Sequence, residues 1–511
     1  MASTSQQPHF ILIPYLSQGQ LIPTIDLAKI LAGRGSIVTI ITTPVNAARF
    51  APIVDRAVAA AGLPIRVLTL EFPAARFSLP AGCENRDVLP SFNLFRNFSD
   101  AVRTLEQPAS ELLDRVDPPP SCIIASQAMH WATEVAARRR IPRLIFDGTS
   151  CFTLCCSHSL QTSKIHEGIP ESERFVVPGL PHRVEFTRAQ LSGLFNPGAH
   201  LDVSEIREKI RESVDRAYGV VLNTFEELEN EYVAECRKTR GGTRKIWCVG
   251  PASLCNTDDV DRAERGKTVV NNGGGDESLC LRWLDSWPEK SVIYACLGSL
   301  NRITPPQAAE LGSGLESTNR PFIWVIRGGY KKEEIENWIS ETGFENRVRG
   351  RGFLIRGWAP QVLILSHPAI GGFLTHCGWN STLEGIAAGV PMATWPQFAE
   401  QFYNEKLVVQ VLGIGVRVGA EVVVHLGEEE KHGVQVGKER IAAAVEELMG
   451  GGDGSVERRR KAAELMEMAR VAVAEGGSSF AGVGMLIEDV AKFASQDESE
   501  MRTTWKQLVG S

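Results

Sequence analysis

The sequence has no cysteine spacing typical of a metal site, no long apolar runs and no excess of basic residues, and each absence excludes a class of protein. Its eleven cysteines include no Cys-x-x-Cys pair, so we expect reduced thiols in a cytoplasmic protein and neither a disulfide framework nor a metal site. The apolar stretches fall far short of the ~20 residues that a membrane span needs. The first ten residues, MASTSQQPHF, do not resemble a signal peptide. A formal net charge of −7 argues against a nucleic-acid partner.

What the sequence does contain is typical of a large globular α/β protein. With 511 residues, 43% of them hydrophobic and 23% charged, the chain is too long for one core and predicts two domains. Strand patterns alternate with helical stretches through the first half, and the strands are expected at 37–43, 65–72, 122–125, 142–147 and 219–225. Repeated βα units predict a parallel sheet with helices on both faces.

The alternation stops at 252–279, which is polar and contains a run of three glycines. No strand pattern feeds this run, so a flexible linker is favoured over a phosphate-binding loop. A second series of strands is expected at 291–299, 321–327, 352–358, 369–376 and 390–395. Two doubly wound domains predict an interdomain cleft, with ligands at the carboxyl ends of the strands.

The loop PYLSQGQLIP (14–23) follows a short apolar strand pattern, PHFILI (8–13), which is the first strand of the series, and it opens the first helix. A strand, a turn and a helix in this order form a ligand-facing corner of an α/β domain. The loop offers Ser17, Gln18 and Gln20, and none of these side chains titrates near neutral pH. If the chain is an enzyme, the source of proton transfer at this corner is an open question.

The segment 358–401 carries the densest set of polar groups at expected strand ends. His376 ends a strand pattern, Gly378 permits close approach of a ligand, and Asn380 and Ser381 stand where a helix cap is expected. Such a turn favours a diphosphate. Glu384 is spaced either to complete a capping box or to reach ribose hydroxyls, and a later strand is followed by Glu400–Gln401, which suit sugar hydroxyls. Each of these residues also has an ordinary structural explanation when it is taken singly.

The order of motifs in this segment is more specific than its single residues. It begins WAPQ, continues through THCGWNS and GVPM, and closes with WP and EQ. In this it resembles the signature box of the plant secondary-product glycosyltransferases, which use UDP-sugars. The resemblance extends to NAARF, LNTFEELE, WCVGP and LCLRWLDSWPEKSVIYACLGSL. It implies the GT-B fold, with two facing Rossmann-like domains and an interdomain cleft.

The resemblance also implies a division of the chain. We expect an acceptor-binding domain at 1–251, a linker at 252–279, a UDP-sugar-binding domain at 280–485, and a C-terminal helix at 486–511 that packs back toward the N-terminal domain.

Carried over by matching motif positions, Trp358 would stack on uracil, Ala359 and Gln361 would bind uracil and ribose, and Glu384 would hold the ribose hydroxyls. The remaining donor-binding residues implied are Gly19, Ser299, His376, Gly378, Trp379, Asn380, Ser381, Glu400 and Gln401. The terminal Gln401 favours glucose as the donor sugar.

The sequence departs from the family at the acceptor corner. Relatives carry a histidine base where this chain has Gln20, and an aspartate that orients it where this chain has Ser126. Three explanations remain open: an acidic acceptor that needs no base, a substitute base, or a slow or inactive enzyme. Asp147 is the candidate substitute base, because it follows the fifth expected strand toward the cleft; a turn cap is its alternative role.

We therefore predict an inverting UDP-glucose-dependent glycosyltransferase that acts on a small plant metabolite such as a flavonoid, a terpenoid or another phenolic or carboxylic acceptor. The resemblance implies no metal and no cofactor besides the UDP-sugar co-substrate. The sequence is silent on oligomeric state, and a monomer is the default expectation. A UDP-sugar-binding protein without efficient turnover is the alternative. A nicotinamide-dependent oxidoreductase is disfavoured, because no G-x-G-x-x-G follows a strand.

Overall fold

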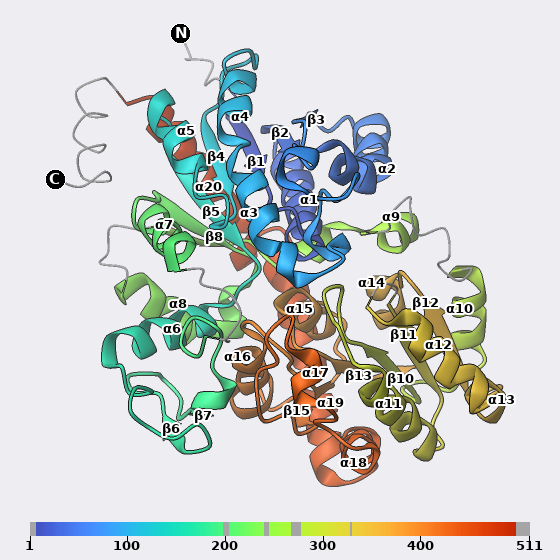
Figure 1. Ribbon diagram of the computed structural model, residues 1–511. Helices are drawn as coiled ribbons and strands as arrows, with labels where there is room; N and C mark the ends of the chain where they lie inside the picture. Colours follow the sequence, from blue (N-terminus) through green and yellow to red (C-terminus); the bar gives the residue numbers. More distant parts are fainter. Residues whose placement is uncertain (1–6, 198–203, 240–244, 267–276, 328–329, 497–511) are drawn as a thin grey trace.

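The N-terminal part of the chain builds a seven-stranded parallel sheet (Figure 1). The computed structural model describes residues 7–197, 204–239, 245–266, 277–327 and 330–496. Within them the first sheet has the order β3-β2-β1-β4-β5-β8-β9. Its strands are β1 (His9–Ile13), β2 (Ile37–Thr42), β3 (Ile65–Thr69), β4 (Cys122–Ala125), β5 (Arg143–Asp147), β8 (Gly219–Leu222) and β9 (Lys245–Cys248).

This sheet is buried on both faces, as its continuous β-branched and apolar strands predict. All five residues of β1 and all four of β4 are buried, and separate apolar clusters pack on the two faces of these central strands. The helices of this part are α1 (Gln18–Gly33), α2 (Pro44–Ala61), α3 (Phe95–Arg103), α4 (Glu106–Leu113), α5 (Ala132–Arg139), α6 (Cys151–Ser163), α7 (Ser204–Asp215) and α8 (Glu226–Thr239). A short antiparallel pair, β6 (Arg174–Val176) and β7 (Glu185–Thr187), lies apart from the sheet.

The C-terminal part builds a second parallel sheet of six strands in the order β12-β11-β10-β13-β14-β15. Its strands are β10 (Val292–Cys296), β11 (Phe322–Ile326), β12 (Gly352–Arg356), β13 (Ile370–Thr375), β14 (Met392–Thr394) and β15 (Gly415–Arg417). Its helices are α10 (Glu277–Asp285), α11 (Pro305–Ser317), α12 (Lys332–Glu341), α13 (Phe344–Arg347), α14 (Gln361–Leu365), α15 (Trp379–Ala387), α16 (Gln401–Lys406), α17 (Glu429–His432), α18 (Lys438–Met449) and α19 (Asp453–Val473). In both orders the chain steps outward from a central strand to one edge and then returns to build the other, which is the doubly wound pattern.

The last described helix, α20 (Ser478–Ala494), crosses back to the N-terminal sheet and packs beside β9 (Figure 1). Ser479 Oγ donates to the carbonyl of Gly250 at 2.5 Å, and Asp489 accepts from the indole N–H of Trp247 at 3.2 Å. Residues 497–511 of the expected C-terminal helix lie outside the described residues. The C-terminal end of the described chain is therefore part of the N-terminal unit.

The segment between the two sheets differs from the flexible linker that its composition predicts. Residues Ala252–Cys255 form a 3₁₀ turn, and Asp259–Glu264 form helix α9, which Asp258 caps by accepting from the N–H of Asp261 at 2.8 Å. The prediction of a flexible linker is therefore wrong for this stretch, because ion pairs to the N-terminal unit fix it without an apolar face. The glycine run lies outside the described residues.

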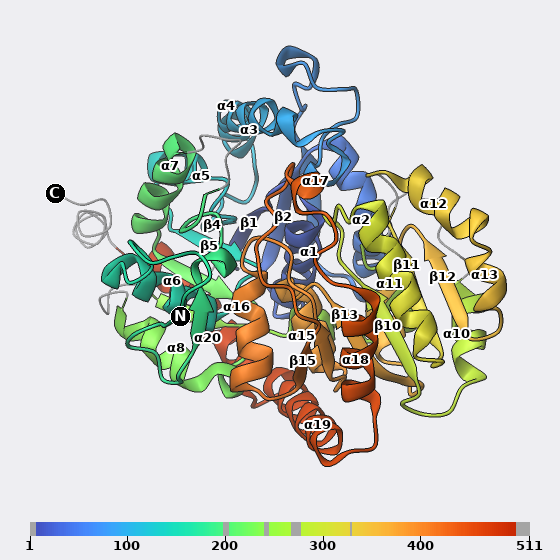
Figure 2. The same cartoon turned by 60° about the horizontal axis from the view of Figure 1, so that its bottom comes forward.

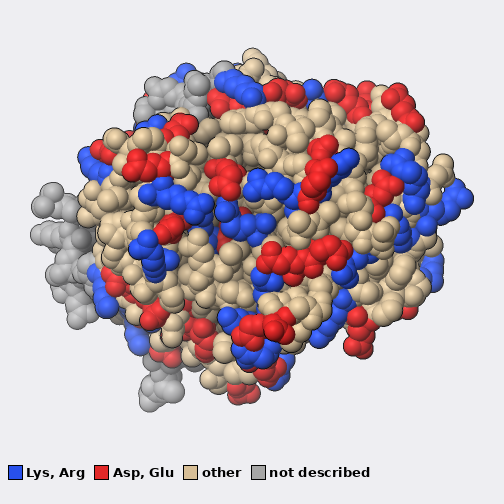
Figure 3. Space-filling view, turned by 90° about the horizontal axis from the view of Figure 1, so that it is seen from below, with Lys and Arg blue, Asp and Glu red and all other residues tan. Residues whose placement is uncertain are grey.

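No helix in the described ranges combines the length and apolar character of a membrane span. Figure 3 shows one face of the molecule, on which basic and acidic side chains lie interspersed. The eleven cysteines all lie within the described ranges and form no disulfide, and Cys255 is the most exposed of them, since the other ten are buried.

Candidate active site

A cleft with a volume of about 270 Å³ lies between the carboxyl ends of the two sheets. The start of α1 lines it on one side, and the loops after β10, β12, β13 and β14 line it on the other. Figure 2 shows α1 of the first domain next to α15 of the second, which Asn380 and Gly19 join. Of the residues predicted from the sequence, fourteen line this cleft: Gly19, Gln20, Ser299, Trp358, Ala359, Gln361, His376, Gly378, Trp379, Asn380, Ser381, Glu384, Glu400 and Gln401. Ser126 and Asp147 do not.

The loop after β13 places His376 between two glycines. A Cβ on Gly298 would lie 2.4 Å from His376 Nε2, and one on Gly378 would lie 2.5 Å from the same atom. Burial, with a further contribution from Arg327, lowers the pKa of His376 to about 4. The imidazole is therefore neutral at physiological pH and can donate one hydrogen bond without carrying charge.

Helix α15 points its N-terminus into the cleft. Gly378 is its N-cap residue, so Asn380 and Ser381 lie in the first turn and not at the cap position expected from the sequence. Asn380 Nδ2 donates to the carbonyl of Gly19 at 2.7 Å, which ties the two units together at this point. The free N–H groups of this turn favour a bound anion.

Trp358 and Glu384 lie in the part of the cleft nearest the segment between the domains. The guanidinium of Arg327 lies 4.6 Å from the centre of the Trp358 ring, a cation–π distance. Gln361 Nε2 donates to Glu384 Oε2 at 2.7 Å and to Ser381 Oγ at 3.0 Å. The other oxygen of Glu384 accepts from Arg265, so Glu384 does not act as a capping-box residue.

Glu400 ends the loop after β14, and Gln401 is the first residue of α16. Gln401 Oε1 accepts from the backbone N–H groups of Gln397 and Phe398 at 2.8 and 3.1 Å. The amide NH₂ is therefore the end of Gln401 that remains for a ligand. Burial raises the pKa of Glu400, opposed by hydrogen bonds from its own N–H and that of Trp379. The Trp379 indole donates to the carbonyl of Asn223 at 2.8 Å, so this side chain holds the two units together while its backbone supports Glu400.

The acceptor corner brings two of its three predicted residues together, beneath the cleft. Ser126 Oγ donates to Asp147 Oδ1 at 2.7 Å, and the N–H of Gln127 donates to Oδ2 at 3.1 Å. Asp147 is 5% exposed, and Gly148 lines the cleft in its place. The expectation that Asp147 faces the cleft is therefore wrong: its carboxylate turns to the end of β4. Gln20 does line the cleft, and its Oε1 has no hydrogen-bond partner among the described residues.

Four charged residues of the cleft were not predicted from the sequence: Arg86, Arg262, Arg265 and Arg327. Arg262 and Arg265 lie in the stretch for which the composition predicts a flexible linker. Arg86 lies in the long loop region that precedes α3. Only the folded chain shows that these four arginines line one cleft, because they come from three separate parts of the sequence.

The family model for UDP-glucuronosyl and UDP-glucosyl transferases matches residues 277–428. The chain is 51% identical over 490 residues to UDP-glycosyltransferase 73E1 of Stevia rebaudiana, covering 95% of this chain and 96% of that protein. It is 48% identical to UDP-glycosyltransferase 73C3 of Arabidopsis thaliana over 95% of this chain and 97% of that one.

Two crystal structures share the fold over nearly the whole chain. One is UGT73P12 of Glycyrrhiza uralensis, complexed with glycyrrhetinic acid 3-O-monoglucuronide, with a TM-score of 0.89, 36% identity, and 98% and 99% of the two chains covered. The other is Arabidopsis thaliana UGT89C1 complexed with UDP-L-rhamnose, with a TM-score of 0.72, 27% identity, and 96% and 100% covered. The two parallel α/β sheets are those of the GT-B fold.

Proposed function

We propose that this chain, which belongs to family 73 of the plant UDP-glycosyltransferases, transfers glucose from UDP-glucose with inversion to an acidic small plant metabolite. The observation that carries the proposal is the composition of the cleft. Fourteen residues matched to the donor and acceptor positions of the family line one continuous space, and its acceptor corner offers Gln20 in place of a base.

The donor end fits a nucleoside diphosphate sugar. Trp358 supplies an aromatic surface for a base, Glu384 supplies carboxylate oxygens for ribose, and the start of α15 supplies N–H groups for a diphosphate. Gln401 and Glu400 lie where the sugar would follow. UGT89C1 binds UDP-L-rhamnose, so the sugar differs within the fold, and glucose is proposed from Gln401.

The reaction is a single displacement at the sugar. An acceptor oxygen forms a bond to the anomeric carbon from one face while the bond to the diphosphate oxygen breaks on the other, so the configuration inverts. The departing UDP gains negative charge, which neutral His376, Ser299 and the N-terminus of α15 stabilise by donating hydrogen bonds, with Arg327 nearby as a cation. These donors are fixed before the reaction starts, so they need little reorganisation.

The acceptor proton decides which substrates fit. General base catalysis is worth ~10²–10⁴ in rate, and an amide such as Gln20 cannot supply it. A phenol with a pKa near ~10 is about 0.1% ionised at neutral pH, whereas a carboxylic acid with a pKa near ~4 has already lost its proton. An acidic acceptor is therefore the class that a cleft without a base serves best.

Arg86 supports an acidic acceptor. It lines the cleft and also an adjoining cavity of about 340 Å³, which Arg302 and Lys331 line as well. Within the described chain, Arg86 Nε has no hydrogen-bond partner, and the guanidinium lies 5.1 Å from the centre of the Phe95 ring. A carboxylate or phenolate of the acceptor would form an ion pair with the guanidinium of Arg86. The relative UGT73P12 binds a ligand that is itself an acid, glycyrrhetinic acid 3-O-monoglucuronide.

A family member that binds UDP-sugar without efficient turnover is the second candidate, and the Gln20 corner favours it equally. Catalysis with Asp147 as a substitute base is less well supported than catalysis on an acidic acceptor, because both oxygens of Asp147 already accept hydrogen bonds beneath the cleft. Turnover of acidic acceptors separates the first candidate from the second.

The donor assignment is tested by thermal unfolding with UDP. A ligand that binds only the folded state raises the melting temperature, so UDP should stabilise the chain. Glu384→Ala and His376→Ala should each reduce this shift, since they remove a ribose acceptor and a diphosphate donor. Differential scanning fluorimetry over a UDP titration measures the effect, with adenosine diphosphate as the control ligand. If neither change alters the UDP response, the donor site lies elsewhere.

A further inference from the structure

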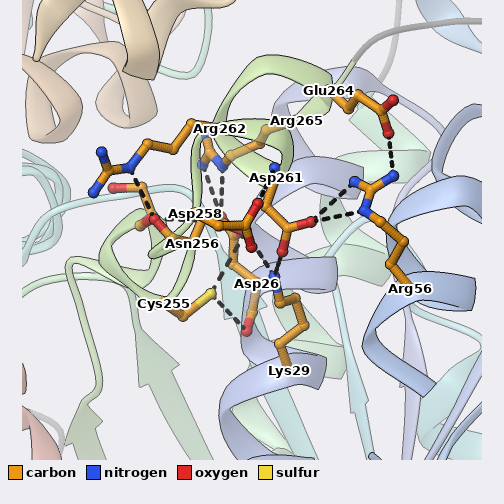
Figure 4. A network of polar contacts seen from close by, with 11 residues as sticks. Asp26, Lys29, Arg56, Cys255, Asn256, Asp258, Asp261, Arg262, Glu264 and Arg265 are labelled. Carbon is orange, nitrogen blue, oxygen red and sulfur yellow. Dashed lines mark hydrogen bonds and ion pairs between the residues drawn. The ribbon is translucent and has the colours of Figure 1, made fainter. Parts of the chain in front are cut away.

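The chain segment between the two domains ends against the donor side of the cleft. It is anchored on the N-terminal unit by the network in Figure 4: Lys29 and Arg56 both pair with Asp261, and Arg56 also pairs with Glu264. Asn256 Nδ2 donates to Asp26 Oδ1 at 2.9 Å. Helix α9 is therefore fixed to α1 and α2, and the residues that follow it have a defined position.

Arg265 connects the anchored segment to the donor side of the cleft, because it binds one carboxylate on α1 and one on α15. Its Nε donates to Asp26 Oδ2 at 2.9 Å, and its Nη2 lies 2.8 Å from the same oxygen. Its Nη1 donates to Glu384 Oε1 on α15. The side chains of all three residues are more than nine-tenths buried, so the ion pairs are shielded from solvent and the loss of one partner would leave a buried charge uncompensated.

The two oxygens of Glu384 are thus each held by a neighbour, Oε1 by Arg265 and Oε2 by Gln361. A carboxylate offers about four acceptor positions. Both neighbours together use two of them, so the carboxylate is fixed in orientation and still has positions for the two ribose hydroxyls. Glu384 lines the cleft beside Arg265, which places these free positions at the cavity.

Gly266 brings the same segment against Trp358. Its φ is +80°, and a Cβ at this position would lie 2.4 Å from Trp358 Cζ2 and 2.5 Å from Ile22 Cδ1. Its carbonyl accepts from Gln18 Nε2 at 3.1 Å. Only glycine combines this backbone conformation with so close an approach. The segment is therefore wedged between α1 and the aromatic surface of the donor site.

We infer that Arg265 is a positioning residue for UDP recognition: it holds the Glu384 carboxylate in the orientation that ribose hydroxyls require, and Gly266 completes the wall of the uridine subsite beside Trp358. The inference rests on the proposed function, because it assigns a role within the same donor site. It predicts that a residue outside both sheets sets the preference for a ribose over a deoxyribose nucleotide.

The test compares UDP with 2′-deoxyuridine 5′-diphosphate, which lacks one ribose hydroxyl and is otherwise the same ligand. Isothermal titration calorimetry on the full chain gives both Kd values for the natural protein, Arg265→Lys and Arg265→Met. Lysine keeps the charge but cannot donate to Asp26 and Glu384 in the same fork geometry. We expect the Kd for UDP to rise by about 10- to 100-fold in both variants. The Kd for the deoxy ligand should change much less, so the preference for UDP should fall.

Two further variants guard against simple loss of folding. Arg265→Met with Asp26→Asn removes the stranded carboxylate on α1 and should show the same loss of preference. Arg320→Met breaks an exposed ion pair with Glu446 in the second domain, outside this network, and should leave the preference unchanged.

Equal weakening of both ligands in the Arg265 variants, no weakening, or tighter UDP binding would each overturn the inference alone. Failure of the natural protein to bind UDP would overturn the proposed function, and this inference with it.

Discussion

Gln20 and the pair beneath it decide which proton chemistry the cleft supports. The Gln20 amide does not titrate, and Ser126 Oγ already donates to Asp147 at 2.7 Å. An aspartate introduced at 126 would therefore stand directly beside a second carboxylate, and one of the two would take up a proton to avoid the repulsion. Introducing a histidine at 20 together with an aspartate at 126 thus requires a change at Asp147 as well.

The first residue-scale prediction follows from this geometry. The triple variant Gln20→His, Ser126→Asp, Asp147→Asn should speed the glycosylation of weakly acidic acceptors by up to the ~10²–10⁴ that base catalysis provides. Carboxylic acids should gain little, because their proton is already gone. Initial rates over a series of acceptors of graded pKa measure the effect, and Asp147→Asn alone is the control. Brisk turnover of an aliphatic alcohol by the natural protein, unaffected by Asp147→Asn, would contradict both an acidic acceptor and a substitute base.

The second residue-scale prediction concerns the donor sugar. Gln401 is oriented by the N–H groups of Gln397 and Phe398, so its NH₂ has a fixed direction. We expect UDP-glucose to be preferred over UDP-galactose, and Gln401→His to reduce this preference by about tenfold, the loss of one well-placed hydrogen bond. The ratio of kcat/KM values for the two donors measures it. A natural protein that uses both donors equally would rule out the assignment.

At the scale of elements, the buried strands were predicted well and the segment between the domains was not. Residues 122–125 form β4, and 37–43 contain β2, because strands buried on both faces must be apolar throughout. Strand β15 has only three residues, too few to show a pattern. Helix α9 has no apolar face that could reveal it. Its Asp261 pairs with Lys29 and Arg56, which lie 232 and 205 residues earlier in the chain, and the helix also packs against α14.

Most of the residues predicted to bind the donor lie within one ordered segment, 358–401, and the structure brings them to one cleft. The hydrogen-bond and ion-pair partners of these residues could not be predicted from the sequence. Glu384 reads as a capping residue from its spacing to Ser381, but Arg265 and Gln361 bind it in the folded chain. Asp147 reads as a cleft residue from its place at a strand end, yet its side chain turns to Ser126. Spacing identifies the end of a strand, whereas the direction of a side chain depends on the neighbouring strand.

The prediction at the scale of elements concerns the contact between α8 and the start of α6, which a buried carboxyl group makes. Glu229 of α8 accepts from the N–H of Phe152, at the start of α6, at 2.8 Å. It also accepts from Thr224 Oγ1 at 2.6 Å. Burial raises the pKa of Glu229 to about 7, although these hydrogen bonds oppose the rise. The folded state then holds its proton more tightly than the unfolded state, whose value is ~4.3.

Protonated Glu229 contributes fully to the free energy of unfolding below about pH 4, and this contribution is lost as the pH rises to about 7. The free energy of unfolding should therefore fall by roughly 3 kcal/mol over this window. Glu229→Gln should remove this part of the pH dependence, as urea unfolding between pH 4.5 and 8 would show. Glu231→Gln, an exposed change on the same helix, serves as the control, and an equal pH dependence in both variants would be evidence against the buried carboxyl.

At the scale of the whole molecule, α20 closes the chain onto its first domain. A Cβ on Gly482 would lie 2.2 Å from the carbonyl oxygen of Cys248, so α20 approaches β9 at backbone distance there. Gly482→Ala should push the helix away and lower the free energy of unfolding by about 1–3 kcal/mol, the usual effect of overpacking.

Gly484 provides the matched control, because a Cβ there would meet only Arg34 Nη2 at an ordinary 3.5 Å. Scanning calorimetry of both variants should show a lower melting temperature for Gly482→Ala alone. Equal melting temperatures would mean that α20 is not held closely against β9.

The anchored segment between the domains also limits how this protein can be recombined with its relatives. Arg265 and Gly266 contact the donor side of the cleft, while Asp26, Lys29 and Arg56 hold their segment from the first domain. A chimera joined downstream of this segment would import a foreign donor domain and keep the native arginine facing it. Exchange at the start of the segment would carry Arg265 along and separate it from Asp26. Neither junction moves Asp26, Arg265 and Glu384 together, so the smallest exchange that keeps these three residues from one parent includes part of the first domain.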